Sequence, residues 1–205
     1  MIPSELLSSI LQILVFTLIP FLVFVIRTRS AKGFFDYIGL KPLPTRAVVW
    51  AIASSLIFLS MVALAFIRTD FWEALTAPES ITGKFRAMGF SPQAMILVLI
   101  MALLKTSLSE EILFRGFLAK RLISWLGFQA GNILQALVFG AIHLLLFLSI
   151  TSSIFFLALI FLFTALGAYT IVYINEKMAG GSIIPGWISH GLANVISYSV
   201  IGFLT

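Results

Sequence analysis

Long hydrophobic runs without a charged residue alternate along this chain with short polar connections. The runs cover residues 6–26, 47–67, 87–104, 122–175 and 178–205. A membrane-spanning helix needs about 20 mostly apolar residues. The run 122–175 is long enough for two such helices, and we expect the serine-rich stretch 149–153 to separate them. The pattern therefore predicts an all-α fold, a polytopic transmembrane helix bundle of about six spans.

Turn and capping residues predict where the later spans begin and end. Ser91 followed by Pro92 is typical of a helix start, and the third span can continue from there to about Lys120. We expect a hairpin turn near residues 126–127, between the third and fourth spans. The sequence Gly180-Gly181-Ser182 predicts the break before the last span.

Composition and charge support a membrane location and orient the bundle. Hydrophobic residues make up 60% of the chain and charged residues 10%, a balance that a soluble globular domain does not have. The first connection is rich in lysine and arginine, which favours the cytoplasmic side. Alternation then predicts a cell-membrane, multi-pass protein with both termini outside and Lys120, Arg121 and Lys177 inside.

The same composition excludes several function classes. The chain has no cysteine, so disulfides, thiolate nucleophiles and cysteine-based metal sites are excluded. No basic run with interleaved aromatic residues suggests nucleic acid, and the expected partner is the lipid bilayer. We divide the chain into residues 1–46, the first span with its basic cytoplasmic connection, and 47–205, a single membrane domain. The first apolar run lacks a basic segment before it and is interpreted as a retained span.

Two adjacent carboxylates, Glu110 and Glu111, lie inside the predicted third span with Arg115 after them. Successive helical residues diverge by about 100°, so we expect the two carboxylates to face different targets. Glu111 and Arg115 have the i,i+4 spacing of an ion pair, which leaves Glu110 free to act as a general base. The alternative is a buried ion-pair cluster that only fixes helix packing. Ionisable residues at this depth are costly and usually functional.

The only two histidines, His143 and His190, lie in later spans. His143 follows Phe139 by four residues and Asn194 follows His190 by four, so each pair shares a helix face. Either histidine alone could be an interhelical hydrogen-bond donor. Together with Glu110 they supply a base, a second proton-handling group and donors for an oxyanion, which suits attack of water on a carbonyl. Counting residues from the predicted turns places Glu110, His143 and His190 in the inner half of the bilayer. We expect the site to open to the cytoplasm.

The three motifs E-E-x-x-x-R, F-x-x-x-H and H-x-x-x-N occur in this order, and the patterns H-E-x-x-H, G-x-G-D and G-x-S-G do not occur. The chain resembles the CPBP family, which comprises CAAX proteases and bacteriocin-processing enzymes and is also called Abi. The resemblance extends from about residue 35 and is strongest over 105–196. It implies an intramembrane, glutamate-dependent endopeptidase similar to type II CAAX prenyl endopeptidases, acting on a membrane-associated peptide or protein substrate.

Carried over to this sequence, the resemblance implies that Glu110 with His143 activates water and that His190 and Asn194 stabilise the oxyanion. Glu111, Arg115 and Phe139 would support them. The family is also labelled a metalloprotease family, and zinc held by Glu110, His143 and His190 is the alternative mechanism. We favour metal-independent catalysis without a cofactor, because asparagine is a poor zinc ligand and a good oxyanion donor.

Two other functions remain open from the sequence. The chain could be a non-catalytic membrane protein that binds a partner or confers immunity to a bacteriocin, a role also assigned to some members of the family. It could also be a small proton-coupled transporter in which Glu110 and the histidines relay protons. Transporters often show internal repeats and more spans, and this chain shows neither. The sequence does not distinguish a prenylated substrate from other peptides with an apolar end.

Overall fold

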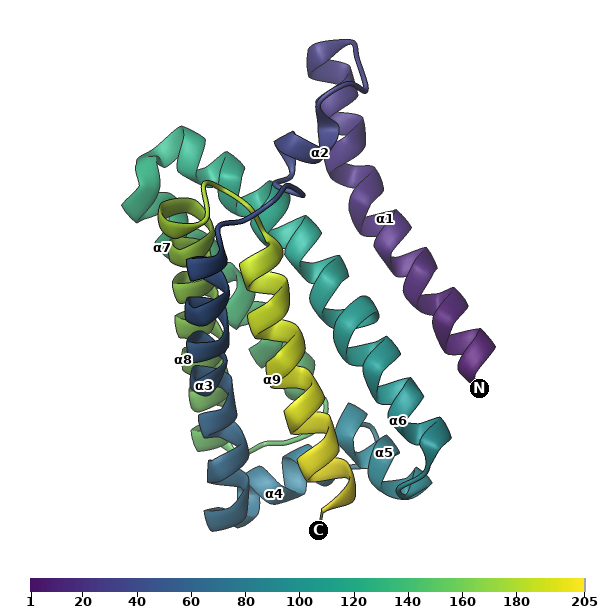
Figure 1. Ribbon diagram of the computed structural model, residues 1–205. Coiled ribbons are helices and arrows are strands. Elements are labelled where there is room, and N and C mark those ends of the chain that lie inside the picture. Colours follow the sequence, from purple (N-terminus) through teal and green to yellow (C-terminus); the bar gives the residue numbers. More distant parts are fainter. Residues whose placement is uncertain (205) are drawn as a thin grey trace.

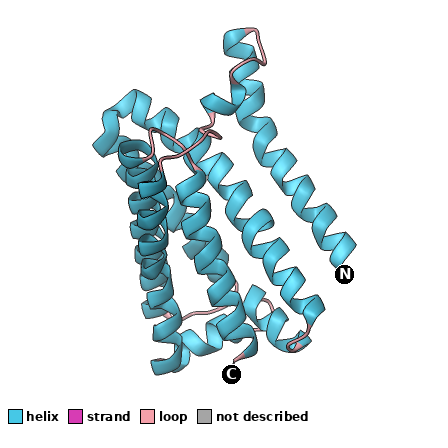
Figure 2. Ribbon diagram, viewed as in Figure 1, coloured by secondary structure: helices cyan, strands magenta, loops and turns pink. Residues whose placement is uncertain are grey.

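A computed structural model of the chain describes residues 1–204, and every regular element in that range is helical. Figure 2 shows these helices joined by short loops, with no strand in the described part. The predicted all-α class is therefore confirmed. Residue 205, the last of the predicted membrane domain 47–205, lies outside the described residues.

The helices follow one another with little intervening chain, and three segments are π-helices, labelled η. In chain order they are α1 Ile2–Thr28, α2 Phe34–Tyr37, α3 Thr45–Ile67, α4 Thr69–Thr76, α5 Ile81–Met88, α6 Pro92–Leu99, η1 Ile100–Leu108, η2 Glu111–Ala119, α7 Lys120–Phe147, α8 Ile154–Tyr173, η3 Ile174–Met178 and α9 Ile184–Phe203.

Helix α9 occupies the middle of the bundle (Figure 1). It packs against α3 on one side and against η1 on the other, while α8 contacts both α3 and α7. Helix α1 lies beside η1 at the edge of the bundle. Both termini lie towards the same end of the molecule in Figure 1, as the predicted alternation requires. The side of the membrane that this end faces stays a prediction.

Within residues 1–204, four stretches are long and apolar enough to cross a membrane: Ile2–Thr28, Thr45–Ile67, Pro92–Phe147 and Ile154–Met178. The third stretch is interrupted at Gly127, which has non-helical backbone angles of φ 77° and ψ 168°. This confirms the hairpin turn that we predicted near residues 126–127. Helix α9 is not among the four stretches, and the predicted count of six spans is not confirmed.

The predicted helix boundaries near serine residues are also confirmed. The Ser91 hydroxyl accepts a hydrogen bond from the Ala94 backbone N–H at 3.1 Å, and Pro92 occupies the first turn of α6. The Ser153 hydroxyl caps α8 in the same way, accepting from the Phe156 N–H at 3.2 Å. These oxygens satisfy N–H groups that have no partner within the helix.

Large apolar side chains cover the outward face of α1. Leu7 and Leu14 are each 58% exposed, and Leu18 is 51% exposed. Such a surface would be a liability in water, but in a bilayer it meets lipid chains of similar polarity. The inner face of α1 packs through Phe24 into the hydrophobic cluster that contains Ile112, and it also makes polar contacts with η1. Gln12 Nε2 donates to the Lys105 carbonyl at 2.8 Å, and Lys105 Nζ pairs with Glu5 at 2.9 Å.

Three connections that the sequence assigns to the cytoplasm meet at one end of the bundle. The Ile183 N–H donates to the Gly39 carbonyl at 2.9 Å. Lys120 Nζ donates to the Gly181 carbonyl at 2.8 Å and pairs with Glu176 at 2.6 Å. The long α6–α7 and α8–α9 segments are thus fixed to the connection after α1, and this sets the depth of α9 against η1 and η2.

Gly39 is the tightest point of this junction. Its φ is +77°, and a Cβ atom would collide with the Gly181 carbonyl. We predict that Gly39→Ala lowers the free energy of unfolding, measured by titration with SDS, by more than the roughly 1–2 kcal/mol that left-handed backbone alone costs. Gly180→Ala is the matched control, because Gly180 has φ +61° but no atom within 4 Å of an added Cβ. Equal losses for the two variants would contradict the role of the close approach.

Candidate active site

Glu110 lies where the two π-helical segments η1 and η2 meet. A π-helix bonds i to i+5, is uncommon, and occurs frequently at functional sites. The wider turns of a π-helix leave some backbone carbonyl groups available to accept hydrogen bonds from side chains of neighbouring helices. The Trp187 indole N–H, from α9, donates to the Leu103 carbonyl at 2.7 Å, and Gln12 from α1 binds the Lys105 carbonyl. The glutamate pair is thus held between α1 and α9.

Glu111 and Arg115 form the ion pair that their spacing predicted. Arg115 Nε lies 3.3 Å from Glu111 Oε1, and the two side chains are 1% and 0% exposed. The guanidinium makes no well-aligned hydrogen bond and instead stacks on the Phe139 ring, with Cζ 3.9 Å from the ring centroid. Both charges are fully buried. Removing either side chain would therefore leave the other buried charge without its partner, at a large desolvation cost.

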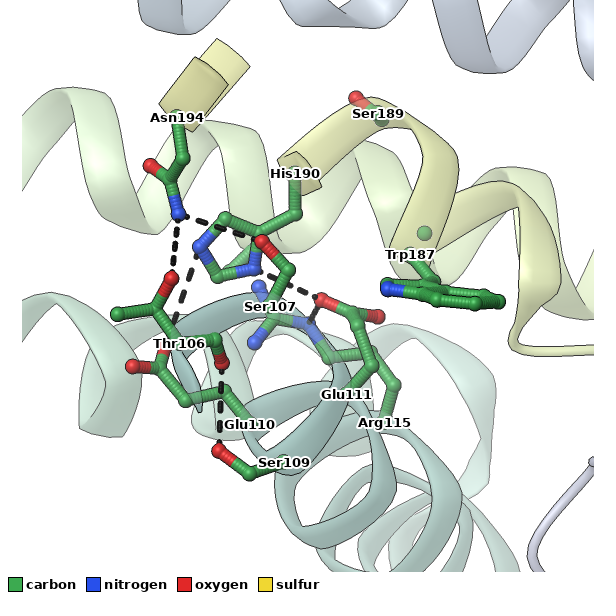
Figure 3. Close-up of polar contacts among 12 residues, drawn as sticks. Thr106, Ser107, Ser109, Glu110, Glu111, Arg115, Trp187, Ser189, His190 and Asn194 are labelled. Atoms are coloured by element: carbon green, nitrogen blue, oxygen red, sulfur yellow. Dashed lines mark hydrogen bonds and ion pairs between the residues drawn. The ribbon is translucent and has the colours of Figure 1, made fainter. Parts of the chain in front are cut away.

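His190 contacts both glutamates, which corrects our expectation that they face different targets. Its Nδ1 lies 3.3 Å from Glu111 Oε1, and its Nε2 lies 4.0 Å from Glu110 Oε2 (Figure 3). The expectation was wrong because it assumed the winding of a regular α-helix and a target group that only one of the two carboxylates can reach. An imidazole ring presents nitrogens on two edges, so two diverging carboxylates can reach the same side chain.

The two carboxylates nevertheless differ in accessibility. The Glu111 side chain is fully buried, whereas the Glu110 side chain is 20% exposed. Glu110 Oε2 is itself buried and has no hydrogen-bond partner in the structure. Glu111 Oε2 is also buried without a hydrogen-bond partner. Partial exposure is therefore what distinguishes Glu110 from Glu111.

Asn194 lies one turn after His190 and is held by two hydroxyl groups of η1. Its Nδ2 is 2.9 Å from Thr106 Oγ1 and 3.2 Å from Ser107 Oγ (Figure 3). Sequence reasoning missed both residues. The available signal was their position four residues before Glu110 and Glu111, which puts them on the same helix face as the carboxylates.

His143 belongs to the second half of α7, after the turn at Gly127. Its Nδ1 is 2.9 Å from the Phe139 carbonyl, a bond within its own helix, so its Nε2 is left for another partner. The ring lies 4.4 Å from the Phe139 ring, and Phe139 in turn lies 6.3 Å from the His190 ring. His143 is also within range of Coulombic interaction with Glu110 and His190. The common level of His143 and Glu110, expected from the count of residues on either side of the turn, stays a prediction.

The alternative zinc site would use Glu110, His143 and His190. Among residues 1–204, no three histidine or carboxylate side chains come together as metal ligands. The choice between metal-independent catalysis and zinc stays a prediction.

Two further residues complete the site and were not found from the sequence. Gly186 lies in the first turn of α9, where a Cβ atom would collide with Glu111 Oε2. Its N–H donates to Asn175 Oδ1 at 3.1 Å. The absence of a side chain at Gly186 allows the buried carboxylate to approach the helix N-terminus, where backbone dipoles favour negative charge.

The comparison with protein families gives one match. Residues 92–196, half of the chain, match the family described as "Type II CAAX prenyl endopeptidase Rce1-like". The chain belongs to this family. The matched segment contains Glu110, Glu111, Arg115, Phe139, His143, His190 and Asn194. No curated protein and no solved structure matched the chain.

Family membership and the apolar helices together establish the coarse function. The chain is a multi-pass membrane protein of the CAAX-protease kind, and its family activity is that of an intramembrane peptidase. The match confirms the resemblance that the three motifs indicated. It assigns no role to any single residue.

We predict that Arg115→Met lowers the free energy of unfolding by about 3–5 kcal/mol, because the buried Glu111 carboxylate then loses its cationic partner and keeps only the His190 contact. Arg68→Met is the matched control and should cost at most about 1 kcal/mol. Arg68 also pairs with a carboxylate, Asp70, at 3.1 Å and also stacks on a phenylalanine ring, but its side chain is 46% exposed. SDS titration of both variants measures the difference, and similar losses would contradict the importance of burial.

Proposed function

We propose that this protein is a glutamate-dependent intramembrane endopeptidase in which Glu110 activates the attacking water. The observation that carries the proposal is the unpartnered, buried Oε2 of Glu110, 4.0 Å from His190 Nε2 and within Coulombic range of His143. A buried acceptor without a partner is costly, and a water molecule that donates to it removes that cost. The same water is then bound to a general base.

In this mechanism Glu110 takes a proton from water while the water oxygen attacks the peptide carbonyl. His143 assists at the water, and its bond to the Phe139 carbonyl fixes the ring so that Nε2 is the reactive nitrogen. The proton on Glu110 then passes to the leaving amine. General acid–base catalysis of this kind contributes typically 10²–10⁴-fold to the rate.

His190 and Asn194 would stabilise the oxyanion. The contact of His190 Nδ1 with Glu111 Oε1 favours a proton on Nδ1 and stabilises a positive charge on the ring, so that Nε2–H can donate to the oxyanion. Glu111 is thus a positioning residue. Stacking of the His190 ring on Phe58, with centroids 6.0 Å apart and planes at 8°, limits its rotation from the α3 side.

Asn194 requires one adjustment to serve as a donor. Its N–H groups face the Thr106 and Ser107 hydroxyls. An amide turned end for end would accept from these hydroxyls through Oδ1 and direct its N–H groups to the oxyanion, with almost the same shape. Thr106 and Ser107 would then orient Asn194 for catalysis.

The substrate class follows from the setting of the site. A peptide bond must enter a helix bundle bounded by lipid, which favours a peptide or protein with a lipidated or apolar end at the membrane surface. The family description names prenylated CAAX substrates, and this proposal extends that class to the chain. We further propose that the site opens to the cytoplasm, since the lysine- and arginine-rich connections gather at one end of the bundle.

The test compares peptides and new protein termini in membranes from cells that express wild type or Glu110→Gln at equal levels. We predict products that occur with wild type and fall by at least about 10²-fold in the variant, the loss expected for a general base. Mass spectrometry of the termini also identifies the substrates.

Glu73→Gln is the control variant, because it removes an exposed carboxylate of α4 without touching the site. It should give the wild-type products. An identical peptide profile for wild type and Glu110→Gln would contradict the enzymatic proposal and favour a non-catalytic role.

A further inference from the structure

A cavity with polar lining lies away from the catalytic residues, between the end of α1, the short helix α2 and the start of α7. Its volume is about 390 Å³. Its polar lining includes Arg27 and Thr28 from α1, Tyr37 from α2, and Arg121 and Ser124 from α7, with Trp125 beside them. Among the described residues that line it, none is acidic. The cavity therefore carries two positive charges without a negative one.

Two polar atoms at this cavity are buried without a hydrogen-bond partner: the Tyr37 hydroxyl and Arg121 Nε. The Arg121 guanidinium stacks on the Tyr37 ring, with Cζ 4.0 Å from the centroid. Stacking uses the face of the guanidinium and leaves its N–H edge free for an acceptor. Most buried polar groups in proteins are hydrogen-bonded, so these two indicate a missing ligand with acceptor oxygens.

The location of the cavity indicates where that ligand comes from. Trp125 is 68% exposed, and Ile26, the residue before Arg27, is also 68% exposed on the apolar surface of α1. Tryptophan beside arginine at the end of an apolar helix is typical of the membrane–water interface. An anion at this depth can be supplied by phospholipid headgroups.

We propose that this cavity is a binding site for the phosphate group of an anionic phospholipid. Arg27 and Arg121 would bind the phosphate oxygens, and the Tyr37 and Ser124 hydroxyls would donate to the phosphate or the headgroup. The acyl chains would lie along α1 past Trp125. Because the cavity joins α1, α2 and α7, the bound lipid would fix the first span to the hairpin that carries the catalytic residues. The site is independent of the proposed peptidase mechanism.

Native mass spectrometry of the protein from nanodiscs with equal amounts of phosphatidylglycerol and phosphatidylcholine tests this site. We predict that wild type retains one phosphatidylglycerol in preference to phosphatidylcholine. Arg27→Gln and Arg121→Gln should each reduce this retention roughly fivefold, the effect of one basic residue near an anionic lipid. Arg27 is exposed, so its variant reports on binding even if Arg121→Gln impairs folding.

Lys32→Gln is the matched control, an exposed basic residue of the same end that does not line the cavity. It should retain the lipid as wild type does. An equal loss for Lys32→Gln, or equal retention of both lipids by wild type, would overturn the proposal. Free phosphate offers the same oxygens, so the measurement is repeated in excess inorganic phosphate. Persistence of the lipid adduct supports the lipid as the ligand, and complete displacement would overturn it.

Discussion

The buried contact of Arg115 and His190 with one carboxylate, that of Glu111, is the interaction on which the rest of the site depends. Arg115 Nε and His190 Nδ1 each lie 3.3 Å from Glu111 Oε1. These side chains come from η2 and α9, and the Arg115 guanidinium also stacks on Phe139 of α7. If the three elements separated, the Glu111–Arg115 ion pair would be exposed to lipid and would lose its contacts with His190 and Phe139, which is costly at low dielectric. The contacts of Glu111 therefore fix the position of the adjacent Glu110.

This division explains why two adjacent glutamates are useful inside a membrane. A carboxylate that holds the fold must be buried, while a carboxylate that activates water must be accessible. Glu111 is 0% exposed and Glu110 is 20% exposed. The π-helical winding around them and the two-edged imidazole of His190 allow both to serve one site. Gly186 completes the arrangement, since any side chain there would displace the Glu111 carboxylate.

Local spacing predicted much of this architecture. The i,i+4 order of Glu111 and Arg115 predicted the ion pair, and the sequence also predicted the turn at Gly127. The contact of His190 with both glutamates could not be predicted in this way. It depends on the rotation of α9 about its own axis and on the departure from α-helical winding near Glu110, and neither leaves a periodic signal. Thr106 and Ser107 do have a periodic signal, four residues before Glu110 and Glu111, but the spacing does not show that their hydroxyls bind Asn194 on another helix.

The most direct test measures stability and peptide cleavage on the same two variants, Glu110→Gln and Glu111→Gln, purified in nanodiscs. The account predicts that Glu110→Gln unfolds at the wild-type SDS concentration but does not cleave the substrate. Glu111→Gln should unfold at a clearly lower SDS concentration, and its loss of cleavage should follow from that. Substantial cleavage by Glu110→Gln, or wild-type stability of Glu111→Gln, would contradict the assignment of chemistry to one glutamate and of architecture to the other.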